Sequence, residues 1–198
     1  MLTGIYLSCA ILVIGVVFYA VDSWLIHRYD KLRTKESGSS RSISYAIFAI
    51  FIVVLLILQP ILWPWLGFQT TAAWGLIMQI IGMVIVLAAL ALHWWARTTL
   101  RQYYSEREEV QSEQKLVYAG PYVYIRHPIY TSYFTSIIGL LLINPTVITL
   151  LIAIYVYWDY GIAVGREEKL LAEKLPGYAD YMKRTTRFFP RIFPPSNK

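Results

Sequence analysis

Five long apolar stretches divide the 198-residue chain, and they limit its fold more than any other feature. They lie at 2–21, 43–63, 72–96, 130–143 and 146–164. A helix needs about 20 apolar residues to cross the hydrocarbon core of a bilayer, and the fourth stretch is shorter than that. His93, Trp94 and Trp95 end the third stretch and are typical of an aromatic belt at a membrane interface. We expect an all-α integral membrane protein with five transmembrane helices, the last two forming a hairpin that turns at Asn144 and Pro145.

The composition agrees with a membrane protein. The chain is 57% hydrophobic and 15% charged, whereas soluble domains carry about a quarter charged residues. Its one cysteine, Cys9, excludes a disulfide framework and a cysteine-built metal site. The three histidines, His27, His93 and His127, lack the spacing of metal ligands, so we expect no metal.

All 18 basic residues fall into three segments, which predict the orientation in the membrane. The segments are 28–41, 97–126 and 166–198, and they share one side of a five-span bundle. The other side, with the N-terminus and the loop 64–71, has none. The positive-inside rule then predicts an outside N-terminus and a cytoplasmic C-terminus. Because the net charge of +6 follows the membrane topology, it does not indicate a nucleic-acid partner.

A cationic turn precedes the short fourth stretch, in "YIRHPIYTSYF" at 124–134. Pro128 cannot continue a helix from the preceding residues, and it keeps His127 extended. One interpretation is a proline-started helix that His127 caps, with Arg126 reaching toward lipid phosphate. The other is an irregular backbone that lines a protein cavity, since such backbone is tolerated at membrane depth only there.

Two flanking features favour a cavity that binds a ligand. Upstream, Gly120 and Pro121 predict a turn between two aromatic-rich pieces. Downstream, Glu167 and Glu168 follow the fifth apolar stretch. A Glu pair there is typical of a solvated helix, but it would also hold the ammonium group of a ligand beside the Arg-His-Pro turn.

The segment "LVYAGPYVYIRHPIY", followed by "EEKLL", "GYADY" and "RFFP", resembles the isoprenylcysteine carboxyl methyltransferase family. That family is related to the membrane phospholipid methyltransferases. The resemblance covers about 93–190, and it implies a cytoplasmic-side pocket for S-adenosylmethionine and a lipophilic or lipidated acceptor that enters from the bilayer. We therefore expect one methyltransferase domain, 1–198, with N-terminal spans in 1–92 and the cofactor-binding and catalytic portion in 93–190.

The resemblance also implies which residues contact the cofactor. They are Gln114, Lys115, Leu116 and Val117 in a strand-like piece, the aromatic Tyr122, the cradle His127, Pro128, Ile129 and Tyr130, and Glu167, which takes the cofactor's amino group. Arg126 has a structural or carboxylate-binding role in this comparison.

A methyl sulfonium is already an activated electrophile, so the enzyme mainly aligns donor and acceptor and excludes water. A carboxylate acceptor needs no general base, whereas an amine, thiol or hydroxyl does. The candidate bases are His127, Tyr130 and Glu168. With Arg126, they are the predicted catalytic residues.

One position departs from the family pattern. The carboxyl-methylating members have an Arg four residues before the acid, where this chain has Ala163. A phospholipid, or another small lipophilic amine or thiol, is therefore an alternative acceptor. A non-catalytic accessory protein that binds anionic lipid is another alternative, although a scaffold would not need His127, Tyr130 and Glu167. A transporter is disfavoured because the chain has no paired broken repeats.

Overall fold

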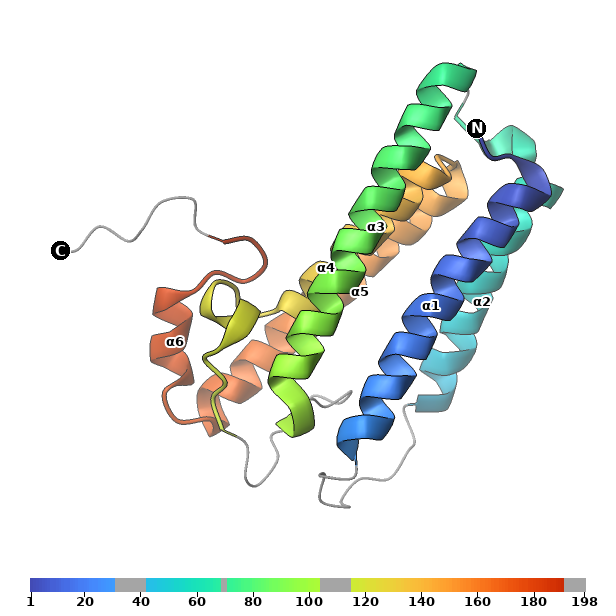
Figure 1. Cartoon of the computed structure of the whole chain (residues 1–198). Helices are drawn as coiled ribbons and strands as arrows, with labels where there is room; N and C mark the ends of the chain where they lie inside the picture. The colour runs from blue at the N-terminus through green and yellow to red at the C-terminus, as the bar shows by residue number, and fades with distance from the viewer. Residues whose placement is uncertain (31–41, 69–70, 104–114, 191–198) are drawn as a thin grey trace.

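The computed structural model describes residues 1–30, 42–68, 71–103 and 115–190, without the side chains of 30, 42–49 and 102. Its long elements are helices (Figure 1). They are α1 (Gly4–Asp30), α2 (Ser42–Leu62), α3 (Ala72–Leu100), α4 (Pro128–Ile143), α5 (Val147–Lys174) and α6 (Tyr178–Arg184), with 3₁₀ turns η1 (Pro64–Leu66), η2 (Arg101–Tyr103) and η3 (Gly120–Val123).

Each predicted apolar stretch forms a helix, α1 to α5 in order. Three of them, within Gly4–Tyr29, Ala72–Leu100 and Val147–Lys174, are long and apolar enough to cross a membrane. The apolar parts Ile50–Leu62 and Pro128–Ile143 are shorter. The chain is thus an all-α integral membrane protein, and the crossing of α2 and α4 stays a prediction.

The helices form two groups in Figure 1: α1 pairs with α2, and α3 lies with α4 and α5. One apolar core joins the five long helices, and its buried members are Leu7, Ile11, Leu56, Val86, Ile137, Ile143, Ile152 and Ala153. In lipid such a core is held by close packing, because the surrounding tails are as apolar as the side chains.

Two glycines bring α3 and α4 together. A Cβ on Gly82 would lie 2.6 Å from the carbonyl oxygen of Gly139, and a Cβ on Gly139 would lie 2.8 Å from that of Gly82. Real Cβ atoms do not approach so closely, so only glycine fits at either position. This contact fixes α4, which begins at the cationic turn, against the long α3.

Neutral polar groups close one end of the bundle, here called the neutral end (Leu2, Gln59, Gln79, Asn144 and Thr149). The side chain of Gln79 accepts from Leu2 N–H and donates to Leu2 C=O, both at 2.8 Å. Asn144 Nδ2 donates to Gln59 Oε1 at 2.8 Å and to Thr149 Oγ1 at 3.3 Å. The loops without basic residues also meet there, since Phe68 N–H donates to Pro145 C=O at 2.8 Å.

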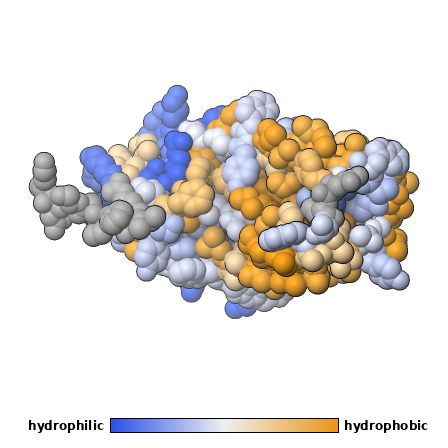
Figure 2. Space-filling model, turned by 90° about the horizontal axis from the view of Figure 1, so that it is seen from above, coloured by the Kyte–Doolittle hydropathy of each residue, from blue (hydrophilic) through white to orange (hydrophobic). Residues whose placement is uncertain are grey.

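Hydrophilic and hydrophobic residues are also separated on the surface of the protein. Figure 2 shows hydrophilic residues gathered toward the side of α6, while hydrophobic residues cover much of the remaining view. Large apolar side chains such as Val13, Val84 and Leu151 are exposed on the long helices. Exposed apolar helix faces are expected where lipid is the solvent.

Candidate active site

The cationic turn starts α4. His127 is the N-cap residue, with φ −124° and ψ 59°, and Pro128 is the first helical residue. Proline is favoured at this position because it lacks a backbone N–H, and the N–H of a first helical residue has no intrahelical acceptor in any case. The prediction that Pro128 begins the helix is confirmed. The His127 side chain makes no cap hydrogen bond, and its buried ring contacts α5 instead.

Glu168 on α5 is the hub of what we call the charged end (Arg126, His127, Glu168 and Arg187). Its Oε1 accepts from Arg126 Nε at 2.8 Å and lies 3.2 Å from His127 Nε2. Its Oε2 accepts from Arg187 Nε at 2.7 Å and lies 2.6 Å from Arg187 Nη2. The carboxylate is 3% exposed. A buried charge needs this degree of pairing to be tolerated.

The second half of the Arg126 guanidinium binds backbone. Its Nη1 donates to Met182 C=O at 3.0 Å and also to Thr185 C=O. The Arg126 side chain is 9% exposed, so it does not extend to lipid phosphate. Arg126 therefore ties α4, α5 and the segment after α6 to one another.

A C-terminal strap (185–188) lies along the turn. The N–H groups of Arg126 and His127 donate to the carbonyls of Thr186 and Arg187, at 2.8 and 3.0 Å. Ile125 and Thr186 form a parallel β-bridge. The strap thus gives the irregular backbone of the turn the partners that a helix would otherwise supply.

The two adjacent acids differ in access. Glu167 has a side chain that is 31% exposed, with Oε2 4.0 Å from His127 Nδ1, whereas both oxygens of Glu168 are occupied. A carboxylate only accepts hydrogen bonds, so the partner of Glu168 Oε1 is a protonated His127 Nε2. In a neutral His127 the lone pair is then on Nδ1, on the side of Glu167.

The predicted strand-like piece shows no regular secondary structure over its described part, 115–117. Lys115 is exposed, and Leu116 packs against the buried cluster of α5 and α6. Val117 packs against Tyr122 and Ile129. Gln114 lies outside the described residues.

The remaining predicted cofactor residues gather around the turn. Tyr122 is buried, and its carbonyl accepts from the Tyr181 hydroxyl at 2.6 Å. Pro128 and Ile129 are buried as well. The Tyr130 ring lies 5.7 Å from the His127 ring, centroid to centroid. The structure therefore brings the predicted turn, the aromatic residue and both acids to one place.

Sequence reasoning missed Arg187 and a second buried cluster. His93, predicted in an interface belt, is instead buried, with Nε2 3.1 Å from Asp22 Oδ1 and Nδ1 3.2 Å from Ser132 Oγ. Arg97 Nε donates to the same Asp22 oxygen at 3.1 Å. The available signal was the spacing of His93 and Arg97, which puts both on one face of α3. Trp94 remains exposed, as an interface residue should be.

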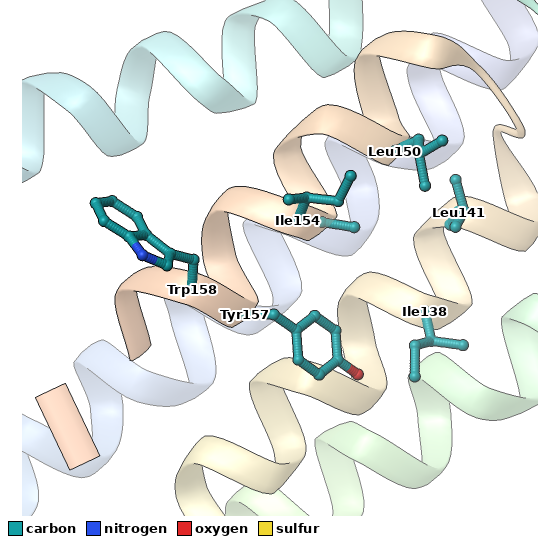
Figure 3. Close-up of a pocket in the computed structure, with 7 residues that line it drawn as sticks. Ile138, Leu141, Leu150, Ile154, Tyr157 and Trp158 are labelled. Atoms are coloured by element: carbon teal, nitrogen blue, oxygen red, sulfur yellow. The ribbon is translucent and has the colours of Figure 1, made fainter. Parts of the chain in front are cut away.

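An apolar groove of about 570 Å³ runs along the α4–α5 hairpin (Figure 3). Its lining residues are Ile138, Leu141, Leu150, Ala153, Ile154, Tyr157 and Trp158. The Tyr157 hydroxyl donates to Phe134 C=O at 3.3 Å. A chain of aromatic rings leads from Tyr157 to the turn: Phe134 stacks on Tyr157, and Tyr160 contacts both Phe134 and Tyr130.

Among the residues described, no group of three or more His, Cys, Asp or Glu side chains could hold a metal ion.

Comparisons with known proteins fit this geometry. Residues 80–173 match the model of the isoprenylcysteine carboxyl methyltransferase (ICMT) family. The nickel-cobalt-cadmium resistance protein NccN of Alcaligenes xylosoxydans xylosoxydans is 31% identical over 113 residues, which are 57% of this chain and 49% of that protein. The cobalt-zinc-cadmium resistance protein CzcN of Cupriavidus metallidurans is 35% identical over 78 residues, 39% of this chain and 36% of that protein. The matches thus span about half, or less, of each relative.

The solved structure of the eukaryotic intramembrane Ras methyltransferase ICMT shares the fold, with a TM-score of 0.70 and 22% identity. The alignment covers 95% of this chain and 67% of that one, so it includes the N-terminal helices that the family match leaves out. The resemblance carried by the Arg-His-Pro turn is thereby confirmed: residues 80–173, just under half of the chain, match the isoprenylcysteine carboxyl methyltransferase family.

Proposed function

We propose that the chain is an integral-membrane methyltransferase that transfers a methyl group from S-adenosylmethionine to a lipophilic acceptor. The division between the two acids carries this proposal. Glu168 is bound by Arg126, His127 and Arg187 and is 3% exposed, whereas the side chain of the neighbouring Glu167 is 31% exposed, with Oε2 4.0 Å from His127 Nδ1. Glu168 then holds the turn in place, and Glu167 accepts the ammonium group of the cofactor.

The residues around the turn fit such a cofactor. It supplies an activated methyl group on a positively charged sulfur, and aromatic faces such as Tyr122 and Tyr130 attract positive charge. Leu116 and Val117 provide apolar walls, and the predicted contacts of Gln114 and Lys115 belong to the same proposal. Pro128 and Ile129, both buried, help to exclude water from the transfer.

The groove of Figure 3 supports an acceptor that comes from the bilayer. It is apolar and lies on the same two helices that carry Tyr130 and Glu167. The aromatic chain connects it to His127, with 5.6 Å between the rings of Tyr130 and Tyr160. We place the apolar part of the acceptor in this groove and its reacting atom near Tyr130.

The proposal has two versions, which differ in whether the methylated atom belongs to a carboxylate or to an amine or thiol. Ala163 cannot neutralise a carboxylate, and Arg126 is already bound to Glu168. A lipophilic amine or thiol therefore fits this chain better than a prenylcysteine carboxylate held in the relatives' manner. Such an acceptor needs a base, and the lone pair on Nδ1 of a neutral His127 is better placed than Glu168, whose oxygens are occupied.

The acceptor class is tested by comparing methyl transfer to a farnesylated cysteine analogue, to its amide, and to lipid amines and thiols. Turnover of the acid alone would contradict the amine or thiol version and leave the methyltransferase proposal intact. Turnover of an uncharged acceptor would support that version.

For the topology we propose five spans, an outside N-terminus and an active site on the cytoplasmic side. The support is the one-sided distribution of basic residues, because the charged end and the neutral end lie at opposite ends of α4. In a Cys9→Ser background, a cysteine at the exposed Trp65 should react with an impermeant reagent from outside. A cysteine at the exposed Lys183 should react only after permeabilisation, and the reverse pattern would invert the orientation.

The cofactor assignment is tested by Glu167→Gln, which keeps the shape and removes the charge. A hydrogen bond to a charged group contributes about 1.5–3 kcal/mol, so the affinity for S-adenosylmethionine should fall about 10- to 150-fold. Isothermal titration calorimetry measures it, and Glu173→Gln, at an exposed position of the same helix, is the matched control. An unchanged affinity would remove Glu167 from the site, and absence of binding by the unmodified protein would contradict the proposed function.

A further inference from the structure

We propose that the hydroxyl of Tyr178 binds the carboxylate at the amino-acid end of the cofactor, an inference that rests on the proposed function. Tyr178 begins α6 and is 3% exposed. Its hydroxyl is buried and has no hydrogen-bond partner among the residues that the structure describes. Buried hydroxyls are nearly always paired, because an unpaired one loses its hydration without compensation. Among the described residues, the Tyr178 hydroxyl is therefore a buried donor that no protein group accepts from.

The packing of Tyr178 places its ring beside the proposed site. Its ring belongs to a buried cluster with Leu171 and Leu175 of α5, and Leu116 packs against that cluster. Leu171 lies one helical turn after Glu167 on α5. Tyr178 thus adjoins both the accessible acid and the piece proposed to lie along the cofactor.

The electrostatics agree with this placement. Burial, together with the nearby carboxylates of Glu168 and Glu167, raises the pKa of Tyr178 well above its ordinary value. The phenol therefore keeps its proton at physiological pH and can donate it. Glu167 and Glu168 lie close enough to affect Tyr178, yet neither forms a hydrogen bond with it.

A zwitterionic ligand end matches this pair of groups. An ammonium group requires an acceptor, which Glu167 offers, and a carboxylate requires a donor, which Tyr178 offers. The guanidinium groups of Arg126 and Arg187 are already bound to Glu168. Among the described residues, the Tyr178 hydroxyl is therefore one donor at this corner of the site that is not bound to Glu168.

Tyr178→Phe tests the inference because stability and binding should respond differently. Removing an unpaired buried hydroxyl should leave the melting temperature unchanged or raise it. The affinity for S-adenosylhomocysteine, measured by calorimetry, should fall about 10- to 150-fold, the effect of one hydrogen bond to a charged group. The affinity for decarboxylated S-adenosylmethionine, which lacks the carboxylate, should be the same in both proteins.

Tyr181→Phe, three residues later on α6, is the matched stability control. Its hydroxyl has a partner, the Tyr122 carbonyl at 2.6 Å. Losing that bond should lower the melting temperature by about 2–4 °C, the shift expected for one lost hydrogen bond in a protein of this size.

Three results would overturn the inference while the proposed function stands. They are an unchanged affinity of Tyr178→Phe for S-adenosylhomocysteine, an equal loss for the decarboxylated ligand, and a fall in melting temperature like that of Tyr181→Phe. Failure of the unmodified protein to bind either ligand would instead overturn the proposed function, and this inference with it.

Discussion

The neutral end and the charged end close the same helix bundle with different chemistry. At the neutral end, amide and hydroxyl groups such as those of Gln59, Asn144 and Thr149 satisfy one another without any charge. At the charged end, Arg126 and Arg187 converge on Glu168. Neutral groups are enough to join distant segments. The charged end adds an irregular turn and a second, partly exposed acid, Glu167, and the proposed ligand site is built on these two features.

Removing the hub of the charged end should have the largest effect. Glu168→Ala leaves the buried Arg126 without its counter-charge, and breaking a buried ion pair lowers the free energy of unfolding by about 3–5 kcal/mol. Thermal unfolding in detergent micelles should show this loss, together with loss of cofactor binding. Glu173→Ala, at an exposed position of α5, is the control. A stable, ligand-binding Glu168→Ala protein would mean that the strap stays bound to the turn without the carboxylate of Glu168.

A change at the neutral end should lower stability alone. Gln59 is 1% exposed, accepts from Asn144 and donates to Trp63 C=O at 2.9 Å. Gln59→Met keeps the volume and leaves Asn144 short of one partner, so the free energy of unfolding should fall by about 1–3 kcal/mol. Cofactor affinity, measured at a temperature where the protein is folded, should be unchanged. Weaker binding would show that the two ends are coupled through α4 and would contradict their division of roles.

The two ends also differ in how far the sequence predicts them. Arg126, His127 and Pro128 are contiguous, so their neighbourhood is local and the motif predicts it. Glu168 was predicted at the site but without its partners, because its contact with Arg187 depends on how α6 returns the chain to the turn. Gln59 and Asn144 lie 85 positions apart, and each looks like a tolerated polar residue in an apolar run.

The five long helices were predictable because apolar length is a strong signal in a membrane. Their ends were not, since α1 and α5 continue beyond residues 21 and 164 to Asp30 and Lys174. Charged residues leave the membrane but still form helix readily, so hydropathy ends before the helix does. The prediction for His93 was wrong for a related reason, since a residue at the end of an apolar stretch can face either lipid or a neighbouring helix. His93 faces α1 because its ring contacts Asp22.

We expect the smallest effect on the melting temperature from removing a solvent-exposed ion pair near the charged end. Asp180 and Lys183 on α6 form an ion pair of 2.8 Å, with side chains 70% and 76% exposed. Exposed pairs gain little because water screens them and both side chains lose freedom. Asp180→Asn should therefore leave the melting temperature unchanged within about 1 °C, a shift too small for a stabilising pair. If it lowered the melting temperature as Gln59→Met does, charge itself would stabilise this end. The contrast between the ends would then rest on net charge and not on the burial of Glu168.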